Sequence, residues 1–367
     1  MRPEDCFSPD YATARARFRA AAEKAGAELI SLSLAANGPD GSPLTIDIAW
    51  CGSRSARRVL LHTSGLHGVE AFAGSAVQVA ALIEAHALPV GCALVLVHVL
   101  NPYGMAWLRR ANENNVDLNR NFLPQGALHG DLQAPTLYAR LDELLNPPSP
   151  PAADLFRLRL VCRAARHGPR RVQQAIAEGQ YRYPRGLFFG GSELEPGPAS
   201  YLHWLGSNLH QAEYLMALDL HTGLGRRGES LLMAEPGVGV TPQRALSAAL
   251  GQPLVALATD ASRPYRVTGS MGAVLPHVLP RARIDFVLQE IGTYGPLSVL
   301  TALRDENRWH HHGSGSIEHP SKYALLEALC PDSAGWRVQA LEKGLALLRA
   351  AAAWTFGGER TAAAHSG

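Results

Sequence analysis

The chain has 367 residues, of which 47% are hydrophobic and 18% charged, with 34 basic and 32 acidic side chains. This composition is typical of a globular protein, and its near balance of charge argues against a nucleic-acid partner. The five cysteines, at 6, 51, 92, 162 and 330, are scattered and odd in number. They indicate neither a disulfide framework nor a thiolate metal site, so a reducing, cytoplasmic location is expected.

The N-terminal region is expected to form a helix and then a hairpin. Residues 1–24 carry acids early and contain no apolar core, so we expect no signal peptide. No segment reaches the roughly eighteen apolar residues that span a bilayer, so no membrane partner is expected. Residues 11–27 show the pattern of an amphipathic helix that ends at Gly26. The alternating segments 29–34 and 44–50 follow as strands and are expected to pair.

The rest of the chain alternates between short apolar runs and helical patterns such as residues 71–87. This alternation predicts an α/β fold with a mixed, mostly parallel twisted sheet and helices on both faces. Between 123 and 200 the chain becomes rich in Pro, Gly and Arg, which we interpret as an insertion, helical at 155–177, within a single domain spanning 1–367. The runs expected to be buried strands are 59–62, 93–100, 215–220, 231–234, 253–258 and 284–288.

Candidate metal ligands follow two of these strands. In HGVE, His67 and Glu70 are three residues apart, which places both on one side of a helical turn or tight loop. His221 comes directly after the run 215–220. Ligands bind beyond the carboxyl ends of the strands in open α/β sheets, so the three side chains are expected to meet there. Two histidines and one glutamate form a set that catalytic zinc uses while keeping a position for water. The sequence therefore predicts one Zn²⁺ per chain at the C-terminal edge of the strands.

Three segments resemble a known family when taken in order. HGVE, then RRANENNVDLNRNF (residues 109–122), then DLHTG (219–223) are similar to the motifs of the zinc carboxypeptidase superfamily, the carboxypeptidase A-like metallopeptidases. The resemblance is stronger to an uncharacterised bacterial domain-of-unknown-function subgroup, and it covers residues 45–295. It implies a zinc carboxypeptidase-like fold with His67, Glu70 and His221 as the zinc ligands.

The same resemblance assigns roles to the loop that contains residues 109–122. Asp117 is similar to the acid that binds the second ring nitrogen of the first histidine, and such an acid fixes the orientation of the imidazole. Asn119 and Arg120 resemble the pair that binds the terminal carboxylate of the substrate, which suits a planar guanidinium. Arg110 resembles the arginine that polarises the scissile carbonyl, and its neighbour Arg109 is an alternative for that role.

Two further residues complete the expected site. Glu290 ends the strand segment IDFVLQE and matches the catalytic glutamate of the family. An acid at the end of an apolar strand is costly to bury, which independently indicates a functional residue. Glu193 and Glu195, in a Gly- and Pro-rich loop, are the alternatives to it. Tyr265, in YRVTGSMG, resembles a tyrosine that covers the substrate.

The resemblance implies a zinc-dependent hydrolase, a metallocarboxypeptidase that cleaves an amide bond next to the free carboxylate of a peptide or peptide-like substrate. An N-acyl amino acid deacylase of the aspartoacylase type would use the same zinc ligands, and a non-catalytic binding module is a third alternative. Asp219 is expected either to support the metal ligands or to bind a second metal. The histidines at 310–312 are expected in a solvated loop. The pattern does not indicate an oligomeric state.

Overall fold

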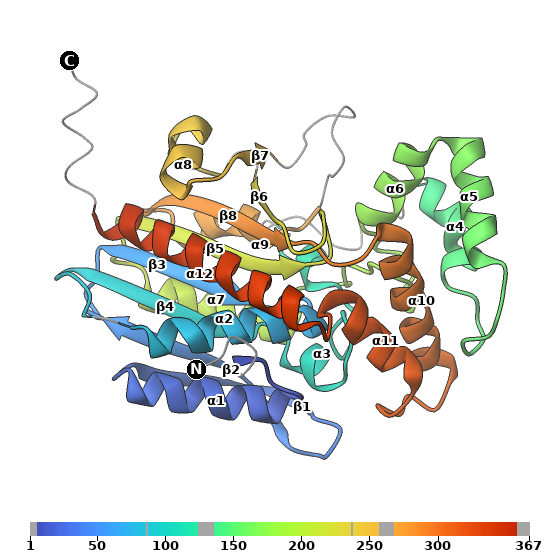
Figure 1. Cartoon of the computed structure of the whole chain (residues 1–367), viewed down its shortest axis with the longest axis horizontal. Coiled ribbons are helices and arrows are strands. Elements are labelled where there is room, and N and C mark those ends of the chain that lie inside the picture. The colour runs from blue at the N-terminus through green and yellow to red at the C-terminus, as the bar shows by residue number, and fades with distance from the viewer. Residues whose placement is uncertain (1–5, 86, 124–135, 236–237, 257–267, 358–367) are drawn as a thin grey trace.

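The computed structural model describes residues 6–85, 87–123, 136–235, 238–256 and 268–357. Within these residues eight strands form one sheet, in the order β1-β2-β4-β3-β5-β8-β6-β7 (Figure 1). The strands are β1 (Glu28–Asn37), β2 (Pro43–Gly52), β3 (Arg58–Ser64), β4 (Cys92–His98), β5 (Tyr214–Thr222), β6 (Ser230–Ala234), β7 (Leu254–Ala256) and β8 (Arg283–Ile291).

Helices cover the sheet and its edges (Figure 1). No helix among the described residues is both long and apolar enough to cross a lipid bilayer. The helices are α1 (Tyr11–Lys24), α2 (Ala71–Ile83), α3 (Pro102–Ala106), α4 (Thr136–Leu145), α5 (Phe156–His167), α6 (Pro169–Ala177), α7 (Pro196–Asn208), α8 (Gln243–Leu250), α9 (Met271–Val278), α10 (Pro296–His312), α11 (Pro320–Leu329) and α12 (Ala334–Phe356).

The centre of the sheet is parallel and its outer strands are mixed. Strands β4, β3, β5 and β8 run parallel, and β1 pairs with β2 as the predicted antiparallel hairpin. Strand β2 is antiparallel to β4, and β6 is antiparallel to β8. The predicted α/β fold with a mixed, mostly parallel sheet is therefore confirmed. The expected run 253–258 is shorter in the structure, where β7 ends at Ala256 and the next residues lie outside the described part.

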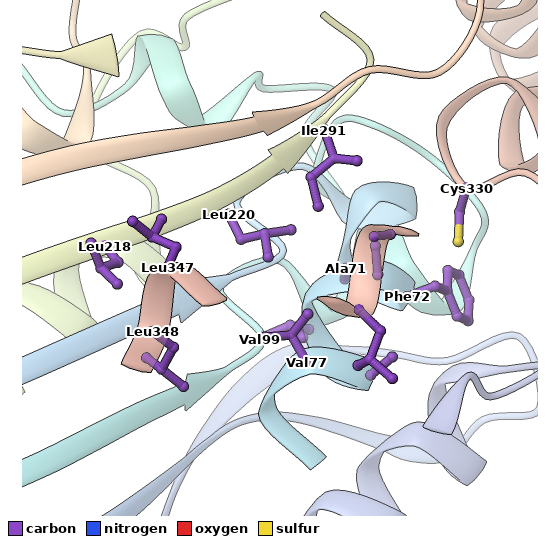
Figure 2. Close-up of a cluster of buried hydrophobic side chains, with 14 of the residues drawn as sticks. Ala71, Phe72, Val77, Val99, Leu218, Leu220, Ile291, Cys330, Leu347 and Leu348 are labelled. Carbon is purple, nitrogen blue, oxygen red and sulfur yellow. The ribbon is translucent and has the colours of Figure 1, made fainter. Parts of the chain in front are cut away.

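Side chains from the central strands alternate between two cores. Leu60, Leu218 and Leu220 pack with α2 and α12 on one face, whereas Leu61 and Ala217 pack with α7 and α9 on the other. Figure 2 shows Leu218 and Leu220 of β5 in the first core, with Leu347 and Leu348 of α12 and with Ala71 and Phe72, which directly follow Glu70. This packing fixes the strand ends that carry the candidate site.

The predicted insertion contains a separate group of helices. Helices α4, α5 and α6 pack together beside α10, beyond the carboxyl ends of the central strands (Figure 1). The single helix expected at 155–177 is instead two, because the chain turns at Gly168, whose φ of 90° favours glycine. Helix α7 begins before residue 200 and packs against the main body at β1 and α9.

The prediction of a solvated loop at the three consecutive histidines is wrong. Residues 310–312 form the last turn of α10 and are half-buried. The aromatic ring of Trp309, the residue before them, stacks on His319 across the turn that joins α10 to α11. The turn therefore packs against the end of α10 and partly buries the three histidines. Their polarity alone had suggested full exposure to solvent.

Candidate active site

The first two predicted ligands are held by a turn between β3 and α2. His67 lies three residues after the end of β3, and Gly68–Glu70 form a 3₁₀ turn that leads directly into α2. The amides of Gly68 and Val69 donate to the carbonyls of Arg110 and Arg109, at 3.1 and 3.0 Å. A Cβ at position 68 would lie 2.0 Å from the carbonyl carbon of Gly104, so only glycine fits this close approach.

The structure brings His67, Glu70 and His221 into one buried cluster. His67 Nδ1 lies 3.0 Å from Glu70 Oε1 and 3.1 Å from Nδ1 of His221. The Nδ1 atom of His221 lies 3.2 Å from Glu70 Oε2, which also accepts a hydrogen bond from the amide of Thr222 at 3.1 Å. Both imidazoles therefore present the same ring nitrogen to a common point.

A carboxylate lies behind each imidazole. His67 Nε2 lies 3.0 Å from a carboxylate oxygen of Asp117, and His221 Nε2 lies 2.6 Å from a carboxylate oxygen of Asp219. Thr63 donates to the other oxygen of Asp219 at 2.6 Å and fixes that carboxylate in turn. Each histidine is thus oriented with Nδ1 toward the cluster, which is the arrangement that metal-binding histidines use. Asp219 takes the supporting position, and no second group of metal-binding side chains is found in the described parts of the chain.

The charges in the cluster act strongly on one another. Burial would raise the pKa of Glu70, but His67 and Arg110 outweigh burial and hold this pKa below its ordinary range. Burial would lower the pKa of His221, yet Asp219 and Glu70 raise it well above its ordinary value. A metal ion that binds Nδ1 of His221 therefore displaces a proton, and its affinity should increase with pH.

The donor set fits zinc. A tetrahedral ion with ligands at about 2.1 Å separates those ligands by roughly 3.4 Å, close to the separations of 3.0 to 3.2 Å found here. Two imidazole nitrogens and one carboxylate oxygen are also a donor set that catalytic zinc sites use. His67, Glu70 and His221 would hold the ion, which leaves one position for water.

The two neighbouring arginines are placed differently. The guanidinium of Arg110 pairs with Glu70 at 2.7 Å and with Asp117 at 3.3 Å, and Arg110 lines a cavity next to the cluster. Arg109 is fully buried, pairs with Glu306 at 3.0 Å and does not line this cavity. Of the two alternatives that the sequence left open, only Arg110 is positioned to reach a substrate.

Glu290 lies next to the cluster. In the parallel register of β5 and β8, His221 pairs with Glu290, whose Oε2 accepts a hydrogen bond from the amide of Leu224 at 3.3 Å. Burial raises the pKa of Glu290 to about 7, with His221 opposing and Glu70 adding to that effect. The alternative acid Glu195 instead accepts hydrogen bonds from Asn112 and Asn114, both at 2.7 Å, away from the cavity.

A cavity of about 440 Å³ joins these residues. Its wall contains His67, Arg110, Asn119 and Glu290 together with many apolar side chains. The apolar side chains come from the sheet, from the predicted insertion and from α10, among them Leu160, Val161, Val172, Ile176, Met233, Phe286, Leu288, Leu297 and Leu300. The site can therefore enclose a substrate with a sizeable apolar part.

Of the remaining predicted residues, Asn119 and Arg120 differ in whether they line the cavity. Asn119 lines the cavity, but Arg120 is fully buried and does not. The guanidinium of Arg120 donates to the carbonyl of Ala177, at 2.5 Å from Nη2, and to the carbonyl of Asn119 at 3.0 Å from Nη1. Ala177 ends α6, where the helix dipole favours a cation. Tyr265 lies outside the described residues.

A family model described as "Protein of unknown function (DUF2817)" matches residues 7–343. The chain belongs to this family. No curated protein matches its sequence. The structure of carboxypeptidase A from Helicoverpa armigera is similar at 14% identity with a TM-score of 0.50, over 95% of this chain and 74% of that one.

Two further solved structures are similar to this DUF2817 chain with TM-scores below 0.5. Murein-tripeptide amidase MpaA from Escherichia coli O157 has 16% identity and a TM-score of 0.36, over 77% of this chain and 92% of that one. Bovine thrombin-activatable fibrinolysis inhibitor has 10% identity and a TM-score of 0.47, over 94% and 97% of the two chains. The likeness to the insect enzyme shows that this chain has the carboxypeptidase-type fold, as the motifs implied.

Sequence reasoning missed one acid in the cavity of this DUF2817 chain. Glu235 directly follows β6 and lines the cavity. A signal for it was available, because it ends an apolar run in the same way that His221 and Glu290 do. No signal was available for the contribution of α5 and α6 to the cavity, since that depends on how distant segments pack.

Proposed function

We propose that this protein is a zinc-dependent metallocarboxypeptidase, which cleaves the amide bond next to the free carboxylate of a peptide or peptide-like substrate. One observation carries the proposal: His67, Glu70 and His221 converge beside Glu290 at the wall of a cavity large enough for such a substrate. The carboxypeptidase-type fold supports it.

The residues around the cavity suggest how each would act. Zinc at this site would supply a Lewis acid that lowers the pKa of water and polarises a carbonyl group. Glu290 would accept a proton from the attacking water and return it to the leaving amine, a role that suits a raised pKa. Arg110 would stabilise the negative charge that develops on the carbonyl oxygen. Asn119 and Arg120 would bind the carboxylate, which for Arg120 requires its guanidinium to leave Ala177.

A second candidate is an N-acyl amino acid deacylase. The apolar side chains that α5, α6 and α10 contribute to the cavity would accommodate an acyl chain as readily as an apolar residue. Both activities need the same metal ligands and the same free carboxylate, so the acyl side of the substrate separates them.

The test is a substrate panel assayed with purified, zinc-loaded protein. It contains peptides with a free C-terminus, the same peptides amidated, and N-acyl amino acids. We expect release of the C-terminal residue from free peptides, and a Glu290→Gln variant that keeps its zinc while turnover falls about 100-fold or more. The exposed Glu193→Gln variant is the matched control and should retain turnover. Equal cleavage of free and amidated peptides by the wild type would rule out the proposal, and a preference for acylated amino acids would favour the deacylase.

A further inference from the structure

Glu235 is an acid in the wall of the cavity beside the candidate metal site. Among the described residues nothing forms a hydrogen bond with its buried Oε2 atom. Its neighbours along the wall are Met233, Phe286 and Leu288, which are apolar. Burial raises the pKa of Glu235, and a hydrogen bond from Ser270 opposes this. A carboxylate with an unpaired oxygen in such surroundings is costly unless a ligand supplies the opposite charge.

The strand register places Glu235 relative to the reacting centre. Leu231 of β6 pairs with Glu290 of β8, and Met233 pairs with Leu288. The ladder ends at Ala234, which pairs with Val287, so Glu235 lies one residue beyond it, about level with Phe286. Glu235 and Glu290 are therefore separated by four residue steps along the sheet, about 13 Å between backbones.

Glu235 is linked through Ser270 to the segment that carries Asn119, the expected carboxylate-binding residue. Ser270, its hydrogen-bond partner, follows Gly269, and the carbonyl of Gly269 accepts from the amide of Phe122 at 3.0 Å. Phe122 is three residues after Asn119, which lines the same cavity. The apolar side chains that α5 and α10 contribute to the cavity belong to helices that lie beyond the carboxyl end of β8 (Figure 1).

We propose that Glu235 determines specificity by binding a cationic side chain, an ammonium or a guanidinium, on the amino acid that the enzyme releases. This proposal rests on the proposed function and names its substrate class. A lysine side chain extends about 6 Å from its Cα, so together with the reach of Glu235 it covers the distance from the reacting centre. Met233, Phe286 and Leu288 would pack against its methylene groups, as apolar residues do around long charged side chains.

The experiment compares two substrates that differ in the charge alone. Benzoyl-glycyl-lysine and benzoyl-glycyl-norleucine have side chains of similar length, but only lysine carries the ammonium. With zinc-loaded full-length protein at pH 8, we expect kcat/KM to favour lysine by roughly 10- to 1,000-fold, the range that a charge-assisted contact gives. Glu235→Gln should reduce this preference to about threefold or less while cleavage of the norleucine substrate continues.

A matched control and a binding measurement make the result decisive. Glu229→Gln removes one exposed negative charge near β6 and should keep the lysine preference. Wild-type protein that cleaves both substrates equally would overturn the role of Glu235 and leave the carboxypeptidase proposal intact. If neither substrate is cleaved, the proposed function fails, and calorimetry with free lysine and norleucine still tests Glu235. Tighter binding of lysine by the wild type but not by Glu235→Gln supports the assignment, and equal binding by both proteins refutes it.

Discussion

At the scale of single residues, the site depends on pairs of groups that hold each other in place. Each histidine of the candidate metal centre has one ring nitrogen turned to the cluster and the other bound to a carboxylate. Such a carboxylate prevents the ring from rotating and increases the basicity of the ligand nitrogen. The two carboxylates thus orient the ring nitrogens that would bind the ion.

Removal of one such carboxylate should weaken metal binding. In Asp219→Asn, the amide oxygen can still accept from His221 Nε2, but the negative charge that supports the imidazole is lost. We expect zinc affinity to fall about 10- to 100-fold, as measured by competition with a chromophoric chelator. An unchanged affinity would show that Asp219 does not support the ligand.

Glu290 should make the stability of the metal-free protein depend on pH. Because burial raises its pKa to about 7, the folded state holds this proton more tightly than the unfolded state. The stabilisation is complete below about pH 4.5, the ordinary value, and is lost as pH rises through about 7. Thermal unfolding after chelation should therefore show wild type losing stability relative to Glu290→Gln between pH 5 and 8. A difference between the two proteins that does not change with pH would contradict the shift.

At the scale of elements, the turn between β3 and α2 is the most constrained part of the site. Gly68 packs so closely on Gly104 and on the carbonyl of Arg109 that the loop around residues 104–110 and the ligand turn cannot move independently. The same loop supplies Arg110, which binds Glu70. The position of the ligands thus depends on backbone contacts between two loops.

A single methyl group should disturb this turn. Gly68→Ala would place a Cβ 2.0 Å from a backbone atom of Gly104, so the turn must shift and His67 and Glu70 with it. We expect at least a tenfold loss of zinc affinity and a destabilisation of about 1–3 kcal/mol, measured by urea unfolding. Gly335→Ala, at a position in α12 where nothing lies within 4 Å, is the matched control and should be neutral or stabilising. Equal behaviour of the two variants would be inconsistent with the packing described.

The elements that sequence reasoning predicted well are those with local signals. Strands β3, β5 and β8 appear as continuous apolar runs because both of their faces are buried. His221 and Glu290 could be found because each ends such a run. The two helices α5 and α6 were expected as one, since the positive φ of Gly168 depends on a chain reversal that the helical pattern does not encode.

At the scale of the whole molecule, the helices of the predicted insertion contact the main body at the site itself. Arg120 forms part of that junction, because its guanidinium binds the carbonyl that ends α6. The two residues are 57 positions apart in the chain, so no local pattern could reveal the contact. For this reason the sequence could indicate the residues of the candidate site from local motifs, but not the helices that line its cavity.

Arg120→Ala separates the structural role of this residue from the role implied by the family. Loss of a buried guanidinium leaves the Ala177 carbonyl without its donor and should cost roughly 2 kcal/mol in urea unfolding. If Arg120 also binds the substrate carboxylate, the preference for free over amidated peptides, expected to be about 10- to 1,000-fold in the wild type, should disappear. Arg159→Ala, on the exposed side of α5, is the control for both measurements. A variant that keeps the preference would exclude Arg120 from carboxylate binding.

The most direct test of the central claim is the metal content of the purified chain. We expect wild-type protein loaded with zinc and then desalted to contain about one ion per chain by elemental analysis, since the site offers three protein ligands. His221→Ala removes one of these ligands and should retain only a small fraction of that zinc, whereas His210→Ala, at an exposed position, should retain all of it. Undiminished zinc in His221→Ala would contradict the assignment of the metal centre.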